Sequence, residues 1–205
     1  MYIAIAGNIG SGKSILAELL SQRLGWTNIT LSEEDGDNPY IDDFYDDMKR
    51  WSFELQLYFL GMRWKNLKRI IEGKENYIID RTIYEDAEVF AKNLLKSGLL
   101  DGRDFNNYYD LYRQVIEQVA APDLLIYLHA SSKKLHENIK LRGRNYEKSI
   151  NKRYLDSLNE RYEDWTFSYS SSPILVVDIE VDDITLSHEA RERVVAKVQE
   201  ILAQR

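Results

Sequence analysis

The sequence predicts an α/β fold in which a five-stranded parallel sheet is flanked by helices. Short apolar runs of strand length recur along the chain, and longer amphipathic segments separate them. Parallel strands need long crossover connections, usually helices, and these segments supply them. The expected strands are residues 2–6, 77–79, 124–128 and 174–177, with 28–31 as a weaker fifth strand.

The amphipathic segments predict the helices that connect these strands. They cover residues 13–24, 44–72, 85–97, 105–119, 132–141, 151–165 and 188–203. Gly25 ends the first helix, since glycine favours the left-handed conformation that often follows a helix C-terminus. The apolar stripe of that helix, expected to face the sheet, consists of Ile15, Leu16, Leu19, Leu20 and Leu24. Without repeats or low-complexity linkers, the chain fits a single domain over residues 1–205.

The composition argues against several classes of partner. Lys+Arg 27 against Asp+Glu 34 gives a formal net charge of −7, which repels nucleic acid and anionic membrane surfaces. No basic segment precedes an apolar run at the N-terminus, and no window approaches the ~18 apolar residues of a membrane span. We therefore expect a cytoplasmic protein that binds neither nucleic acid nor membrane.

The residue types present also limit the metal chemistry. Cys 0 excludes disulfides, thiolate nucleophiles and zinc–thiolate sites. The histidines, His129, His136 and His188, show no paired helical spacing. Any metal is therefore expected to be a hard cation on oxygen ligands.

Residues 7–14 match the pattern G-x-x-x-x-G-K-[ST] between an expected strand and an expected helix. Backbone N–H groups of such a loop converge on phosphate oxygens, and the helix N-terminus adds positive potential. Lys13 is expected to reach the β- and γ-phosphates, and Ser14 to bind Mg²⁺. The sequence thus predicts nucleoside triphosphate binding by Gly7, Asn8, Ile9, Gly10, Ser11, Gly12, Lys13 and Ser14.

Two classes of nucleotide-binding protein do not fit the rest of the chain. A GTPase needs D-x-x-G and N-K-x-D, but D-x-x-G does not occur and the Asn-Lys at Asn151 is followed at the fourth position by Tyr154. A motor or DNA-dependent ATPase normally ends a strand in paired acids, whereas here a strand ends in Asp80-Arg81. A single acid followed by arginine favours a small-molecule kinase.

Candidates for the acceptor site follow two strands, because open parallel sheets bind ligands at the carboxyl ends of their strands. Glu33 is placed to accept a proton from an acceptor hydroxyl, and the alternative is a solvated acidic loop together with Glu34. Asp80 and Arg81 end another strand, and their alternative is a surface ion pair.

Two helices offer polar groups for a heterocyclic base. Gln56 and Arg63 are seven residues apart, so they share one face that is otherwise largely apolar. Asp86 and Phe90, four apart, share a face of the helix that follows Asp80. A buried glutamine presents one acceptor and two donors to a base edge, and a phenylalanine stacks on its ring. The alternatives are a snorkelling arginine, a surface aspartate and a core phenylalanine.

Three cations, Lys140, Arg142 and Arg144, gather near the end of a helix. Beside a phosphate loop they predict a lid over residues 140–150, whose arginines neutralise charge on the transferred phosphoryl. The alternative is a solvated helix end that complements the dipole.

In this order, these motifs resemble the deoxyribonucleoside kinase family over nearly the whole chain. The family pattern is a phosphate loop, a strand-terminal Glu, a helix with Q-x6-R, a [DE]-R-[ST] strand end followed by an acid, and an R-x-R-x-x-E lid. Residues 37–45, D-N-P-Y-I-D-D-F-Y, are similar to the corresponding loop of bacterial purine deoxynucleoside kinases. The resemblance implies a P-loop kinase fold with an arginine-bearing lid, and transfer of the γ-phosphoryl of ATP, with Mg²⁺, to the 5′-hydroxyl of a deoxynucleoside in salvage.

The resemblance also assigns roles by position. It implies Glu33 as the base for the 5′-hydroxyl, with Arg81 and Lys13 at the transferred phosphoryl. The implied substrate-binding residues are Ile9, Glu33, Tyr45, Leu55, Gln56, Arg63, Arg81, Asp86, Phe90 and Glu147. Of these, Tyr45 and Glu147 hold the 3′-hydroxyl. The remaining implied contacts are Arg142 and Arg144 to the donor nucleotide, and Asp80 with Ser14 to Mg²⁺.

The resemblance further bears on substrate and assembly. Arg63 and Asp86 occur together in relatives that accept deoxyadenosine, deoxyguanosine or deoxycytidine, and the loop at 37–45 favours a purine. Deoxyadenosine is therefore the expected substrate, with deoxyguanosine and deoxycytidine next. A homodimer and inhibition by the end-product triphosphate are also implied.

The chain departs from the family pattern at two positions, and two rival functions fit it less well. Asn138 stands where many members have a further lid arginine, and Glu33-Glu34 stands where many have Glu-Pro. A monophosphate kinase of the thymidylate kinase type needs basic residues for the acceptor phosphate, but this region holds Glu33, Glu34, Asp35 and Asp37. A nucleotide-binding regulator without turnover is disfavoured by the intact catalytic positions.

Overall fold

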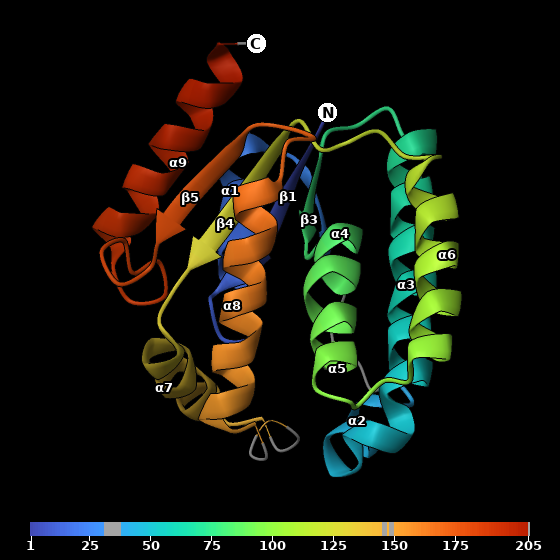
Figure 1. Cartoon of the computed structure of the whole chain (residues 1–205). Helices are drawn as coiled ribbons and strands as arrows, with labels where there is room; N and C mark the ends of the chain where they lie inside the picture. Colours follow the sequence, from blue (N-terminus) through green and yellow to red (C-terminus); the bar gives the residue numbers. More distant parts are fainter. Residues whose placement is uncertain (31–37, 145–146, 148–149, 205) are drawn as a thin grey trace.

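The centre of the molecule is a sheet with strand order β2-β3-β1-β4-β5 and all neighbouring strands parallel (Figure 1). The computed structural model describes residues 1–30, 38–144, 147 and 150–204. Its strands are β1 (Tyr2–Gly7), β2 (Thr27–Thr30), β3 (Tyr77–Asp80), β4 (Leu124–His129) and β5 (Ile174–Asp178). The predicted five-stranded parallel sheet is confirmed, and every strand end lies within one residue of its expected position.

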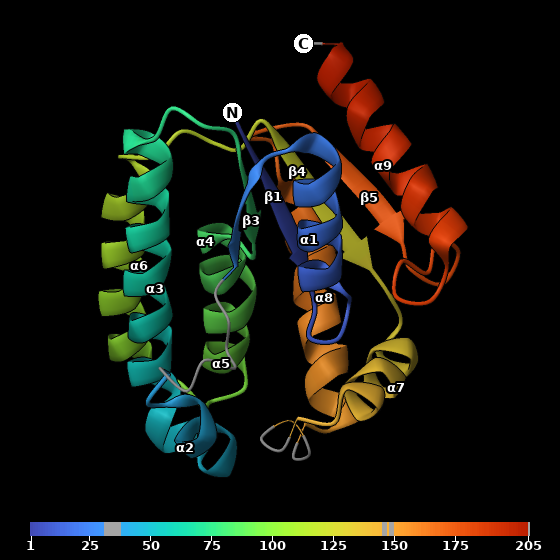
Figure 2. The same ribbon diagram turned by 180° about the vertical axis from the view of Figure 1, so that it is seen from behind.

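Helices cover both faces of this sheet. They are α1 (Lys13–Leu24), α2 (Ile41–Asp46), α3 (Met48–Glu72), α4 (Ile83–Glu85), the π-helical η1 (Asp86–Ala91), α5 (Lys92–Lys96), α6 (Gly102–Ile116), α7 (Ser132–Arg142), α8 (Lys152–Ser168) and α9 (His188–Ala203). Helix α8 and the continuous α4–η1–α5 helix lie in front of the sheet in Figure 1, and α1 with α9 lie on the opposite face, seen in Figure 2. Helices α3 and α6 pack side by side beyond α5.

The single helix expected over residues 44–72 is two helices. Asp47 interrupts it with φ −139° and ψ 83°, and its carboxylate accepts a hydrogen bond from the Arg50 N–H at 3.1 Å. Aspartate competes for backbone N–H groups in this way at helix starts, so it caps α3 and separates it from α2. Helix α2 lies next to the start of α3, at the end of the molecule toward which the strands run (Figure 1).

The helix expected from residue 85 begins two residues earlier. The hydroxyl of Thr82 accepts a hydrogen bond from the Glu85 N–H at 3.0 Å and so caps the first turn. The segment Asp86–Ala91 is then wound as a π-helix. π-Helical segments are rare in proteins, and those that do occur are frequently found at functional sites.

One residue of the expected apolar stripe of α1 does not face the sheet. Ile15 is 42% exposed, whereas Leu16, Ala17 and Leu20 are fully buried. Ile15 instead lines a hollow beside the phosphate loop. Position along the helix, as well as its periodicity, therefore decides which apolar side chains are buried.

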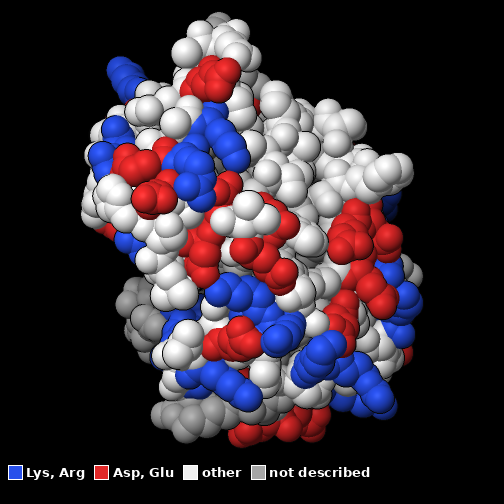
Figure 3. Space-filling model, turned by 90° about the vertical axis from the view of Figure 1, so that its left-hand side faces the viewer, with Lys and Arg blue, Asp and Glu red and all other residues white. Residues whose placement is uncertain are grey.

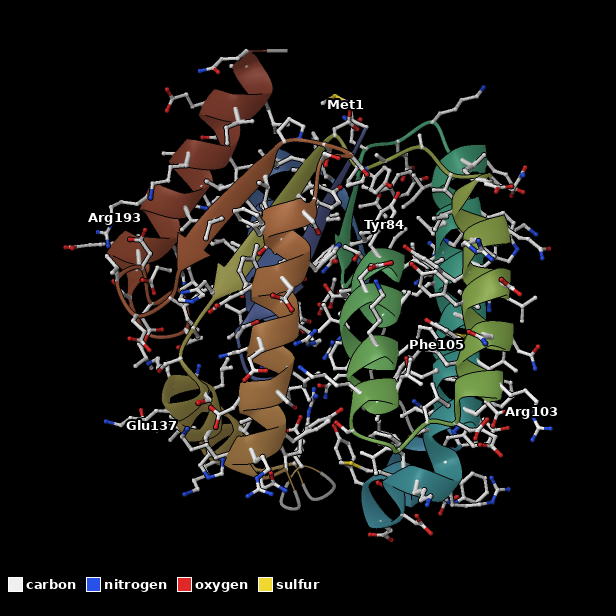
Figure 4. All side chains as sticks on the ribbon, in the orientation of Figure 1. Met1, Tyr84, Arg103, Phe105, Glu137 and Arg193 are labelled. Carbon is white, nitrogen blue, oxygen red and sulfur yellow. The ribbon has the colours of Figure 1, made fainter. Side chains whose placement is uncertain are left out.

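Aromatic side chains fill the space between the outer helix pair and the rest of the molecule. Phe105 lies between α6 and α5 (Figure 4) and stacks on Tyr109 with 5.3 Å between ring centroids.

On the face that carries α9, basic and acidic side chains intermingle (Figure 3). Arg193 of α9 pairs with Asp182 at 2.8 Å. Among the helices of the described residues, none has the length and apolar character needed to cross a membrane.

Candidate active site

The phosphate loop lies between β1 and α1, at the carboxyl edge of the sheet (Figure 2). Gly10 has φ 84°, and a Cβ there would approach the carbonyl oxygen of Leu135 to 2.8 Å, so a larger residue does not fit. Lys13 Nζ donates to the carbonyl oxygens of Gly7 and Asn8 at 2.8 Å and 3.0 Å. The loop thus holds its own lysine across its mouth, where phosphate oxygens would bind.

Side chains from α7 and α8 fix the loop from behind. Asn8 Nδ2 donates to Leu155 O at 3.1 Å and to Asn159 Oδ1 at 2.7 Å. Asn138 Nδ2 donates to Gly10 O at 2.9 Å. Asn138, the departure from the arginine of many relatives, therefore supports the loop backbone. The Oγ of Ser11 is buried and has no hydrogen-bond partner among the described residues.

Two oxygen ligands suited to a magnesium ion meet beside the loop. Ser14 Oγ donates to Asp80 Oδ2 at 2.5 Å, which brings the first turn of α1 to the end of β3. Asp80 Oδ1 is buried without a partner in the described part of the chain. Mg²⁺ is commonly held by one or two protein oxygens together with substrate phosphates, so this donor set fits that ion.

A pocket opens next to the loop, between the end of β3, helices α2 and α3, and η1. It is lined by Ile9, Ile41, Phe44, Tyr45, Leu55, Gln56, Phe59, Arg63, Arg81, Asp86, Phe90 and Tyr154. The structure therefore brings together most of the expected substrate-binding residues. Four of these residues, Ile41, Phe44, Phe59 and Tyr154, are not among the expected site residues, because a single apolar or aromatic residue does not by itself distinguish a pocket wall from a core.

A buried ion pair forms the floor of this pocket. Arg63 Nε donates to Asp86 Oδ2 at 2.9 Å, and both side chains are 5% exposed. Arg63 Nη1 also donates to the carbonyl oxygen of Asp80 at 3.3 Å. Gln56 Oε1 is buried and has no partner among the described residues, so one acceptor beside the pair remains for a ligand. The pair costs desolvation energy, which is consistent with a role in recognition.

Arg81 lines the pocket from a strained backbone position directly after β3. Its φ is 69°, and no other described non-glycine residue has a positive φ. The Arg81 N–H donates to Ile5 O at 2.9 Å, and the guanidinium lies over the Phe90 ring, 4.9 Å from its centroid. Such strain persists only where the surroundings enforce it, and it concentrates at functional sites.

Glu85, which sequence analysis did not single out, lies fully buried beside Arg81. Its Oε1 is 3.4 Å from Arg81 Nη1. Burial raises the pKa of the Glu85 carboxyl to about 7, although the nearby cations Arg81 and Lys13 oppose that rise. The sequence held one signal, a Glu four residues after a strand-terminal Arg, but that spacing is also common on exposed helices.

Arg142 and Arg144, the arginines of the expected lid, lie around the same hollow as Lys13. This second hollow is lined by Gly10, Gly12, Lys13, Ser14, Ile15, Asn138, Leu141, Arg142, Arg144, Thr185 and Leu186. Arg142, the last residue of α7, pairs with the buried Glu147, with 3.1 Å between Nε and Oε2. Arg144 Nη1 lies 3.7 Å from Glu147 Oε1. The structure thus places Glu147 with the lid arginines and not among the residues that line the first pocket.

The expected base, Glu33, and its neighbour Glu34 lie outside the described residues. They precede Asn38 and Tyr40, where the described chain resumes, and Asn38 Oδ1 accepts a hydrogen bond from the Tyr40 N–H at 3.0 Å.

The parallel sheet, the glycine-rich loop with Lys13 and the strand-terminal Asp80-Arg81 define a P-loop kinase. The model of the deoxynucleoside kinase family matches residues 3–203, and the chain belongs to this family. It is a deoxynucleoside kinase, an enzyme that takes a nucleotide phosphate donor and a nucleoside acceptor. The assignment decides against the monophosphate kinase and regulator alternatives.

Individual relatives agree with the family assignment. The chain is 35% identical to the deoxyadenosine/deoxycytidine kinase of Bacillus subtilis (strain 168), over 98% of this chain and 92% of that protein. It is 44% identical to the deoxyadenosine kinase of Dictyostelium discoideum, over 80% of this chain and 66% of that protein. A solved structure of deoxyadenosine kinase from M. mycoides with dCMP and dCDP bound superposes with a TM-score of 0.85, at 34% identity, covering 98% of this chain and 100% of that one.

Proposed function

We propose that this enzyme transfers the γ-phosphoryl of ATP to the 5′-hydroxyl of deoxyadenosine, with Mg²⁺ bound, and accepts deoxyguanosine and deoxycytidine less well. The choice of base rests on the buried Arg63–Asp86 pair and on Gln56 Oε1, which has no hydrogen-bond partner among the described residues. Gln56 accepts from the exocyclic amino group of adenine while its amide donates to a ring nitrogen. A thymine methyl would meet the charged pair, which disfavours thymidine. Relatives named for deoxyadenosine support the choice.

On the donor side, the phosphate loop and Lys13 bind the triphosphate, and Arg142 and Arg144 reach the transferred phosphoryl from the end of α7. The hollow that contains these side chains supports this arrangement. Ser14 and Asp80 would hold Mg²⁺, which supplies positive charge that neutralises the phosphate oxygens. The loose transition state of phosphoryl transfer asks mainly for such positioning and charge neutralisation.

On the acceptor side, Glu33 takes the proton of the 5′-hydroxyl, and Arg81 lies against the phosphoryl that is being transferred. Tyr45 holds the 3′-hydroxyl from the pocket wall, and Phe90 stacks on the base with Ile9 and Leu55 as walls. Glu147 would reach the same hydroxyl from the lid, where it pairs with Arg142. The proximity of Arg81 to both Ile9 and Asp86 in one pocket supports this assignment.

The substrate assignment is tested by a coupled assay of ADP release, with ATP, Mg²⁺ and each of the four deoxynucleosides. Deoxyadenosine is expected to give the highest kcat/KM. Thymidine as the best substrate would refute the pocket assignment, whereas deoxyguanosine as the best would refute only the choice of base within it.

Replacing Asp86 is expected to weaken discrimination among the bases. Removing a buried partner of a base-recognising group typically costs about 1 to 3 kcal/mol, so Asp86→Ala should reduce the preference for deoxyadenosine over thymidine by roughly 10- to 100-fold. If the alanine variant unfolds, Asp86→Asn replaces it in the test, because asparagine keeps the side-chain volume and leaves no cavity beside Arg63. The ratio of kcat/KM values measures the effect, and KM for ATP should not change. An unaltered ratio in a folded variant would contradict the assignment.

The homodimer implied by the family is proposed to form through α3 and α6. Leu57 and Ile71 of α3 are 39% and 52% exposed, Leu111 of α6 is 43% exposed, and the fourteen-residue spacing on α3 puts the first two on one face. Light scattering should give twice the chain mass of 24.1 kDa. Ile71→Glu with Leu111→Glu should produce monomers, whereas Val181→Glu, at another exposed apolar position, should not. A wild-type monomer would overturn this proposal.

A further inference from the structure

The helix that follows β3 contains a buried carboxylate, Glu85, whose presence the packing of the fold does not explain. Glu85 has no exposed surface, and its Oε2 has no hydrogen-bond partner among the described residues. A half-satisfied buried carboxylate costs stability, so the fold alone gains nothing from it. Its other oxygen, Oε1, faces Arg81 and the hydroxyl of Tyr162.

Tyr162 is the second member of this arrangement. Its hydroxyl is 3.2 Å from Glu85 Oε1 and 2.8 Å from the carbonyl oxygen of Gly7, the first residue of the phosphate loop. The ring is fully buried on α8 and stacks on Tyr127 with 5.7 Å between centroids. The hydroxyl therefore cannot move without repacking the core.

We infer that Glu85 and Tyr162 are positioning residues that tie Arg81 to the phosphate loop, so that the acceptor-side arginine and the donor-side loop hold one fixed separation. The inference rests on the proposed role of Arg81 at the transferred phosphoryl. Glu85 Oε1 lies 3.4 Å from the Arg81 guanidinium, and the single proton of the Tyr162 hydroxyl is shared between Glu85 Oε1 and Gly7 O as a three-centre hydrogen bond, which links the two sides. Phosphoryl transfer depends steeply on such distances, because a misplacement of about 1 Å costs up to 10²-fold in rate.

The groups that face Glu85 make the link sensitive to pH. Lys13 from the start of α1, Arg81 before α4 and Arg63 from α3 favour the ionised carboxylate, whereas the adjacent Asp86 opposes it. Two further titratable groups, the hydroxyls of Tyr162 on α8 and Tyr127 on β4, also interact electrostatically with Glu85. With its pKa raised to about 7, the carboxyl gains charge as pH rises through neutrality, and the charged form binds Arg81 more strongly.

The test is steady-state kinetics of Glu85→Gln and Tyr162→Phe with ATP and the best deoxynucleoside of the wild type. We expect kcat to fall about tenfold in each variant, while KM for the deoxynucleoside changes less than about twofold. The double variant should fall no further than the worse single variant, because both changes break one link. Wild-type kcat should rise with pH through about 7, and this limb should disappear in Glu85→Gln.

Glu88→Gln is the matched control. This carboxylate lies three residues further along, where it accepts from Tyr109 Oη at 2.6 Å, away from Arg81. The control should retain wild-type kcat and its pH profile.

The outcomes separate this inference from the proposed function. If the wild type phosphorylates no deoxynucleoside, the proposed function fails. If the wild type is active but both variants match the Glu88→Gln control, or the double variant shows multiplied losses, the inference fails alone. Should Glu85→Gln not fold, Tyr162→Phe decides, because it keeps the stacked ring and loses only the hydroxyl.

Discussion

Replacing Lys13 by alanine is expected to abolish phosphoryl transfer, lowering kcat by about 10³-fold or more. The ammonium group bridges the carbonyl oxygens of Gly7 and Asn8 across the loop, where it is placed to meet the triphosphate. Without it, the charge that develops on the phosphate oxygens loses a fixed cation held in the loop. The coupled assay of ADP release with deoxyadenosine measures the loss.

The fold should survive this change. Lys13→Ala removes two hydrogen bonds to loop carbonyls and no core side chain, so Tm should fall by no more than about 10 °C. Lys133→Ala is the control, because this lysine is exposed in the first turn of α7. A folded Lys13→Ala protein with turnover within tenfold of the wild type would mean that residues 7–14 do not bind the reacting phosphates.

Changing Glu33 to glutamine is expected to lower kcat by roughly 10²-fold or more, with a smaller effect on KM for the nucleoside. The amide cannot accept the proton of the 5′-hydroxyl, although it still occupies the same volume. Because proton transfer occurs only in the transition state, the loss appears in kcat. Titration of the deoxynucleoside at saturating ATP separates the two parameters.

Glu34→Gln is the internal control for this prediction, since the neighbouring carboxylate changes in the same way. It should retain nearly full activity. The opposite result, with Glu34→Gln crippled and Glu33→Gln active, would shift the position of the base by one residue. Glu33 is preferred because the resemblance of the sequence motifs to the family assigns the base to this position.

Local sequence patterns predict the regular elements well where tertiary contacts do not compete. Helices α1 and α9 have the expected bounds, since Gly25 and Ser187 mark their ends with turn and cap chemistry that acts over a few residues. The break at Asp47 depends on one side-chain cap, and periodicity alone reveals neither this break nor the π-helical segment that starts at Asp86.

The sequence by itself determined the phosphate loop, the strand-terminal Asp80-Arg81 and the family, because these depend on residue types at short fixed spacings. Only the tertiary structure decided which apolar residues wall the pocket, that Asn138 supports Gly10, and that Glu147 pairs with Arg142. Glu85 and Tyr162 are 77 positions apart in the chain, yet their oxygens lie 3.2 Å apart. Contacts of this kind arise only when the sheet and its covering helices pack together, so no local pattern records them.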